Sequence, residues 1–164
     1  INDIKNIDNF THTEEIEVSI KLPILIPEKY IPDLSLRLSL YRRVGEIQEI
    51  DELNLFKAEM INRFGVIPDE FSNYLDVMVL KLLARKCSIA KIYVFKKIYS
   101  IKFDKRRTEY SENFIKWVTN NKNKIILKDS HEIKIIHEID DAKKQLFDII
   151  NLVKKILELL ETKG

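Results

Sequence analysis

Alternation of apolar and polar positions marks the first clearly patterned segment, residues 16–22. Every second residue there is apolar, which is the period of a strand with one buried face. Pro23, Pro27 and Pro32 follow, and they exclude a helix through that stretch because proline lacks a backbone donor and clashes with the preceding turn. We therefore expect a short strand followed by an irregular, proline-rich connection.

Residues 34–48 are ambiguous at their start, because alternating leucines there fit a strand as well as a helix. Continued at the helical period, the apolar residues of the whole segment fill one broad arc and the polar residues fill the opposite arc. Asp33 is also well placed to cap the first turn. The pattern predicts a helix over 34–48 with Leu34 and Leu38 on its core-facing arc.

Two further helices are expected over 51–64 and 68–86. An apolar stripe along the first of them ends at Phe64, and Gly65 stops the helix there as a left-handed C-terminal cap. In the second, Pro68 suits the first helical position, and the acidic pair that follows suits the positive end of the helix dipole. The N-terminal half is therefore predicted to be helical.

Beyond residue 86 the pattern changes to short β-branched and aromatic segments. They predict strands over 92–94 and 98–103, a helix over 111–120, a hairpin from 124–128 to 132–137, and a helix over 142–160. Asp140 is the expected N-cap of the last helix, whose apolar stripe we assign to the core because about three heptads are few for a coiled coil. The fold class is α+β: a helical N-terminal half, a small mixed α/β C-terminal half with two short strand pairs, and a long closing C-terminal helix.

Composition places the chain among globular domains. Hydrophobic residues make up 45% of its 164 residues and charged residues 33%, so it has the material for a core. The single cysteine, Cys87, forms no internal disulfide and points to a reducing, cytoplasmic compartment. No apolar run has the length of a membrane span, so no membrane partner is expected.

The residues offer little for catalysis. Only three glycines are present, Gly45, Gly65 and Gly164, so neither glycine-rich phosphate-binding motif can be written. The three histidines are far apart, and we take His131 and His137 as surface residues on a hairpin rather than metal ligands. No catalytic, cofactor-binding or metal-binding residue is proposed, and the chain is expected not to be an enzyme.

Charge is uneven along the chain despite a net charge of +2. The stretch 91–134 is strongly basic, whereas 28–76 is acidic. Phosphate contacts are conceivable for Lys102, Lys105, Arg106 and Arg107, with Tyr99 or Phe103 stacking on bases. We favour a solvated loop, since these aromatics alternate as core residues of a strand do, and keep nucleic-acid binding as the alternative function.

Three segments carry a family resemblance. They are Leu-Pro at 22–23 with Tyr-Ile-Pro-Asp at 30–33, then Arg-Leu-Ser-Leu-Tyr-Arg-Arg at 37–43, and then Glu-Leu at 52–53 leading to Glu-Met-Ile-Asn-Arg-Phe-Gly-Val-Ile-Pro-Asp at 59–69. In this order and spacing they resemble the carboxy-terminal domain of the bacterial transcription-repair coupling factors. The resemblance runs more loosely to the C-terminus and covers about residues 15–160.

The resemblance implies a division of the chain and a set of partners. Residues 1–13 would be a linker from an upstream motor, and residues 14–164 a regulatory domain that holds no cofactor. By this resemblance the full-length protein is a double-stranded DNA translocase that displaces stalled RNA polymerase and recruits the excision-repair protein UvrA. ATP and magnesium would belong to its motor. The domain would dock on and mask the UvrA-binding module of the same protein and restrain the motor.

Two acidic positions make the masking contact in this family and meet arginines of the UvrA-binding module. The resemblance places the first at Glu59, whereas the second is Asn62, which can accept a hydrogen bond but brings no charge. The predicted helix fits such a contact, because Leu55, Glu59 and Asn62 lie at i, i+4 and i+7 on one outward face. We therefore expect an exposed leucine beside a carboxylate to form the docking patch.

Overall fold

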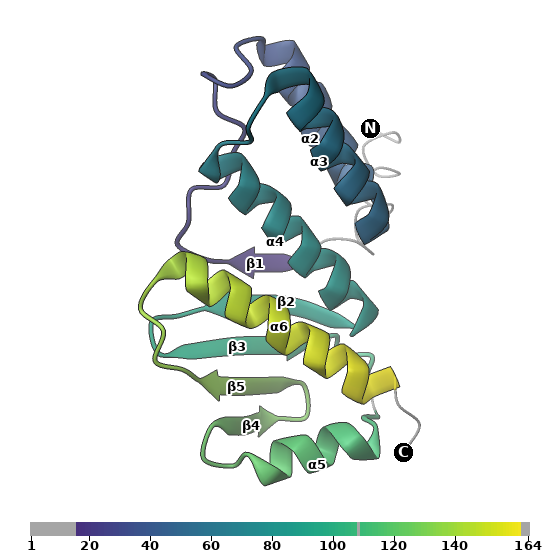
Figure 1. Ribbon diagram of the computed structural model, residues 1–164. Helices are drawn as coiled ribbons and strands as arrows, with labels where there is room; N and C mark the ends of the chain where they lie inside the picture. The colour runs from purple at the N-terminus through teal and green to yellow at the C-terminus, as the bar shows by residue number, and fades with distance from the viewer. Residues whose placement is uncertain (1–15, 108, 162–164) are drawn as a thin grey trace, which may run out of the picture.

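Five helices and one five-stranded sheet make up the part of the chain that the computed structural model describes, residues 16–107 and 109–161. The predicted linker, residues 1–13, lies outside the described residues. In chain order the elements are β1 (Glu17–Ser19), α2 (Leu34–Glu46), α3 (Ile50–Phe64), α4 (Asp69–Lys86), β2 (Ile89–Val94), β3 (Ile98–Phe103), α5 (Glu112–Asn120), β4 (Ile125–Asp129), β5 (Glu132–Ile136) and α6 (Ala142–Glu161). The α+β class is confirmed, with α2 and α3 at one end of the molecule and α5 at the other (Figure 1).

Helices α2 and α3 follow local signals closely. The Asp33 side chain accepts a hydrogen bond from the backbone N–H of Leu36, as an N-cap does. Gly65 ends α3 with the expected positive φ of 88°, although its ψ of −161° takes the chain out of the left-handed helical region. One expectation was wrong: Leu34 and Leu38 are exposed, with 60% of the Leu34 surface open to solvent. The arc of leucines is wider than the strip of α2 that its neighbours cover.

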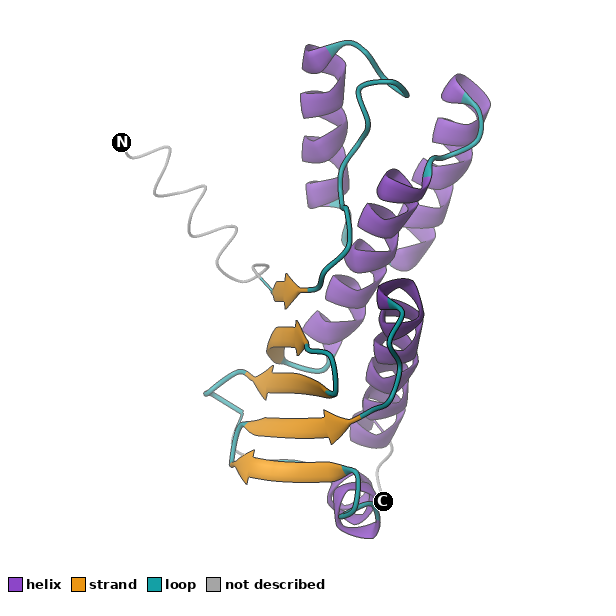
Figure 2. Ribbon diagram, turned by 90° about the vertical axis from the view of Figure 1, so that its left-hand side faces the viewer, coloured by secondary structure: helices purple, strands orange, loops and turns teal. Residues whose placement is uncertain are grey.

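The two predicted strand pairs belong to a single sheet with the order β1-β2-β3-β5-β4. β3 joins them, since it pairs antiparallel with both β2 and β5. The first strand is shorter than predicted, three residues long, and it pairs parallel with β2. Helices α4 and α6 cover one face of the sheet, while no described helix lies over the other face (Figures 1 and 2).

Helix α6 packs on the sheet, as expected. Leu146, Ile149, Val153 and Ile156 are buried there in the same core as β2, β3 and β5. Its predicted N-cap, Asp140, is wrong by one residue. The side chain of Asp141 accepts the backbone N–H of Lys144 at 2.9 Å, because the helix begins at Ala142.

Helix α4 links two hydrophobic cores. Phe71 and Leu75 belong to a core shared with α2 and α3, whereas Leu80 and Leu83 belong to the core under the sheet. Because a helix surrounded on two sides buries more than one stripe, α4 is apolar around much of its circumference and joins the helical unit to the sheet.

Candidate functional site

Helix α3 presents a polar and an apolar side chain together on its outer face. Leu55 has 72% of its surface exposed, and Asn62 is also exposed. Glu59 lies between them with 36% of its side chain exposed. On the inner face, Phe56 and Met60 are buried in the helical core. The predicted orientation of α3 is therefore correct, whereas a docking role for its outer face remains a prediction.

Glu59 is held by two arginines of the same chain. Arg43 of α2 donates from Nη1 to Oε2 at 2.7 Å and from Nη2 to Oε1 at 2.9 Å. Arg63, one turn along α3, donates from Nη1 to Oε2 at 3.0 Å. The hydrogen bonds from Arg43 and then Arg63 lower the pKa of Glu59 to about 2, and the pKa of Arg43 is raised in turn. This carboxylate is therefore ionised and already bound within the domain.

A shallow hollow of about 410 Å³ lies beside Leu55, between α2 and α3. It is lined by Ile47, Leu55 and Phe56 together with Arg43 and the carboxylates of Glu46, Glu52 and Glu59. The guanidinium of Arg43 lies over the ring of Phe56, with its Cζ 5.2 Å from the ring centroid. With three carboxylates and one guanidinium, the hollow carries net negative charge and suits a basic group from a partner.

Of the four basic residues in 102–107, Lys102, Lys105 and Arg106 line one hollow of about 720 Å³, together with the carboxylates of Asp104, Asp129 and Glu132. Lys102 lies over the ring of Tyr93 at 5.4 Å, and Arg107 lies against Phe103 at 6.0 Å. Arg106 is bound by the side chain of Asp104 through two hydrogen bonds of 2.8 and 2.9 Å. Hydrogen bonds from Arg106 hold the pKa of Asp104 well below its usual range. The neighbouring carboxylates thereby neutralise much of the cationic charge available for phosphate.

Two other residues of the nucleic-acid alternative are placed differently from that prediction. Tyr99 and Phe103 are buried in the core under the sheet and cannot stack on bases. Arg106 is largely exposed, and Lys105 is exposed in the same loop, as the solvated-loop interpretation predicts. Phosphate binding by this loop remains a prediction.

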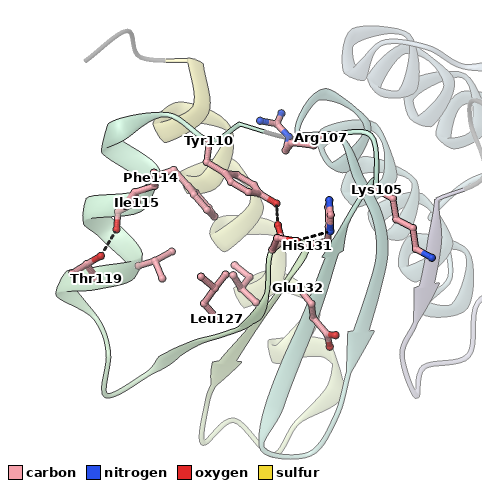
Figure 3. Close-up of a pocket in the computed structure, with 12 residues that line it drawn as sticks. Lys105, Arg107, Tyr110, Phe114, Ile115, Thr119, Leu127, His131 and Glu132 are labelled. Carbon is pink, nitrogen blue, oxygen red and sulfur yellow. Dashed lines mark hydrogen bonds between the residues drawn. The ribbon is translucent and has the colours of Figure 1, made fainter.

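Sequence reasoning missed an apolar hollow of about 560 Å³ between α5 and the β4–β5 hairpin. In Figure 3, Ile115 and Thr119 of α5 lie across it from Leu127 of β4. The hydroxyl of Tyr110 donates to the backbone oxygen of Ser130 at 2.7 Å and ties the segment before α5 to the hairpin. The only available signal was that Ile115 and Leu127 are apolar at positions where their elements face solvent.

The histidine prediction was half wrong. His137 is buried rather than on the surface: its ring stacks on Tyr99 with centroids 4.0 Å apart, and Nε2 lies 2.8 Å from the backbone oxygen of Phe95. β5 pairs antiparallel with β3, and just past it the backbone N–H of His137 donates to the backbone oxygen of Lys97 at 2.9 Å, which holds the ring against Tyr99. Cys87 is fully buried, and burial raises the pKa of its thiol to about 12.

Within 16–107 and 109–161, no group of three or more His, Cys, Asp or Glu side chains has an arrangement that suits a metal ion. Over the same ranges, no helix combines the length and the apolar character needed to cross a bilayer.

Comparison with known proteins identifies the family. Residues 20–114 match the family model described as "TRCF domain". The chain is 35% identical over 124 residues, 76% of its length, to the transcription-repair-coupling factor of Rickettsia conorii, and 31% identical over 142 residues to that of Rickettsia prowazekii. It is 38% identical over 80 residues to the Escherichia coli factor. The chain spans only 11% and 12% of the length of the two Rickettsia proteins.

A solved structure agrees with the fold. It is described as the crystal structure of the C-terminal domain of transcription-repair coupling factor, and it superposes with a TM-score of 0.76 over 92% of this chain and 96% of that one. The sequence identity of 19% limits this likeness to the fold. The family match and the relatives carry the assignment: this chain belongs to the TRCF domain family of transcription-repair-coupling factors.

Proposed function

We propose that this chain is an autoinhibitory protein-interaction domain of a transcription-repair coupling factor. In this proposal it comprises residues 14–164, docks on the UvrA-binding module of the same protein and masks it. A double-stranded DNA translocase motor elsewhere in that protein would carry ATP and magnesium, displace stalled RNA polymerase and be restrained by the docked domain. Membership of the TRCF domain family fits a non-catalytic role for the chain itself.

The observation that carries the proposal is the composition of the outer face of α3. Leu55 is an exposed apolar side chain, and it stands at the edge of a hollow that contains three carboxylates. A docking site of this kind buries the leucine and pairs the carboxylates with basic side chains, which gives affinity and orientation together. The buried residues behind the face, Phe56 and Met60, hold it on the helical core.

The proposal is tested by calorimetric titration of the chain with a purified UvrA-binding module. We expect saturable binding, and we expect Glu59→Arg to abolish it because the substitution places a third arginine beside Arg43 and Arg63. Glu112→Arg is the matched control: Glu112 is an exposed helical glutamate paired with a basic residue on α5, at the other end of the molecule (Figure 1). Equal affinity for the wild type and Glu59→Arg would refute the proposed contact.

A further inference from the structure

We infer that Glu59 and Phe56, in the wall of the hollow beside Leu55, form a binding site for an arginine side chain, that Arg43 occupies this site in the free domain, and that docking exchanges Arg43 for a basic side chain of the partner. The inference rests on the proposed function for the identity of the partner. The site itself follows from the contacts of Arg43.

Arg43 already has the contacts that a partner's arginine would seek. Its guanidinium makes a two-pronged contact with Glu59, through bonds of 2.7 and 2.9 Å, which is the geometry in which arginine binds carboxylates most specifically. The same group covers the ring of Phe56, an aromatic surface that is otherwise buried. Glu59 and Phe56 thus form an arginine site in the wall of the hollow, and Arg43 occupies it.

Glu59 has no room for a second two-pronged partner while Arg43 and Arg63 are both bound. Each carboxylate oxygen accepts about two hydrogen bonds. Oε2 already accepts from Arg43 and from Arg63, and Oε1 accepts from Arg43. A partner's arginine that is to bind Glu59 through both oxygens must therefore displace one of the two.

The structure distinguishes Arg43 from Arg63 as the residue to be displaced. Arg43 lines the hollow, whereas Arg63 does not and lies over Phe64 at 4.8 Å. The side chain of Arg43 is 46% exposed, so it can turn into water without opening the core. Once it leaves, the hollow keeps the carboxylates of Glu46, Glu52 and Glu59 and gains negative charge, which attracts the incoming cation.

Arg43 therefore competes with the partner and weakens docking. We expect Arg43→Ala to bind the UvrA-binding module roughly twofold to fivefold more tightly than the wild type, the factor that an exposed ion pair commonly contributes. Arg63→Ala is the matched control, since it removes the other arginine on Glu59 but leaves Arg43 in place, and it should change affinity by less than half of that effect. Unchanged binding by Arg43→Ala would mean that Arg43 has no part in docking, and weaker binding would mean that it contacts the partner directly. Either result would overturn the exchange.

A second measurement tests the site without the partner module. Capped arginine, N-acetyl-arginine methylamide, is titrated into ¹⁵N-labelled chain while the backbone signals of Leu55, Phe56 and Glu59 are followed by NMR. We expect saturable shifts in Arg43→Ala, a half-saturation concentration roughly twofold to fivefold higher in the wild type, and much smaller shifts with capped norleucine. Equal half-saturation concentrations in the two proteins, or no saturation of Arg43→Ala, would contradict occupation by Arg43.

The two measurements separate the inference from the proposed function. If Arg43→Ala binds capped arginine while the chain does not bind the UvrA-binding module, the arginine site is supported and the proposed partner is refuted. Glu59-dependent binding of the module that Arg43→Ala weakens would support the partner and refute the exchange. Arg43→Met, which keeps an apolar stem over Phe56, serves as the folding control and should show the same tighter binding of the module if exchange is correct.

Discussion

Truncation of Leu55 separates docking from folding. In the free domain this side chain is 72% exposed and contributes little to the core. Leu55→Ala removes three carbon groups from the proposed contact and leaves a good helix former in α3. We expect the variant to fold as the wild type does and to lose affinity for the UvrA-binding module.

The size of the loss follows from the exposed fraction. Burial is worth about 0.8 kcal/mol for each carbon group, so three groups amount to about 2.4 kcal/mol when fully transferred from water. Because only the 72% of Leu55 that is exposed can be newly buried, docking stands to lose about 1.7 kcal/mol by the same coefficient. That corresponds to a dissociation constant roughly fifteenfold higher, at about 1.4 kcal/mol for each factor of ten.

Calorimetric titration measures the loss, and thermal melting monitors the fold. The midpoint should move by no more than about 2 °C, since exposed substitutions change stability by about 0.5 kcal/mol at most. Ile115→Ala is the control: Ile115 is an exposed apolar residue on α5, far from α3 (Figure 1). If Leu55→Ala binds within twofold of the wild type while Ile115→Ala weakens binding, the docking face lies near α5 and the argument from α3 is wrong.

Three other predictions concern single ionisable or polar groups. Hydrogen bonds from its arginines lower the pKa of Glu59 to about 2, so the contribution of Glu59 to stability is present above its unfolded-state pKa and is lost as the pH falls toward 2. An NMR titration of this carboxyl group should show an inflection near pH 2, and the inflection should move to higher pH in Arg43→Ala. Since burial raises the pKa of the Cys87 thiol to about 12, an aromatic disulfide reagent should modify it only when the domain unfolds, and rapid modification of the folded domain would disprove its burial. Tyr99→Phe removes the 2.8 Å hydrogen bond to Asp148 but keeps the ring, so urea unfolding should show a loss of about 1 kcal/mol, whereas unchanged stability would mean that water replaces the bond at no cost.

Helix positions were predictable because the signals for them are local. Asp33 caps α2 and Ser111 caps α5, and each lies only three residues before the backbone N–H that it binds. A positive φ at Gly65 ends α3 for the same local reason. The outward placement of Leu55 follows from helical periodicity alone, once the helix is assigned.

Pairing between distant segments was not predictable in this way. The parallel pairing of β1 with β2 joins residues more than 70 positions apart, and the antiparallel pairing of β3 with β5 makes one sheet of two predicted pairs. Neither pairing can be read from the alternation of apolar and polar residues along the strands. The same holds for Arg43 and Glu59, which are 16 residues apart on different helices and meet only because α2 packs against α3. The burial of His137 likewise depends on the fold of the hairpin, not on its neighbours in sequence.

The outer face of α3 and the side chain of Arg43 differ in how firmly the rest of the domain holds them. Phe56 and Met60 anchor the inner side of α3, and the ring of Phe56 lies 6.2 Å from that of Phe71 on α4, which continues into the core under the sheet. The outer face of α3 is therefore displayed from a packed unit, and little backbone ordering remains to be lost on docking. Arg43, by contrast, is a long and half-exposed side chain whose displacement changes only its own rotamers. Affinity can then be adjusted by substituting this one arginine, while the surface that the partner meets keeps its shape.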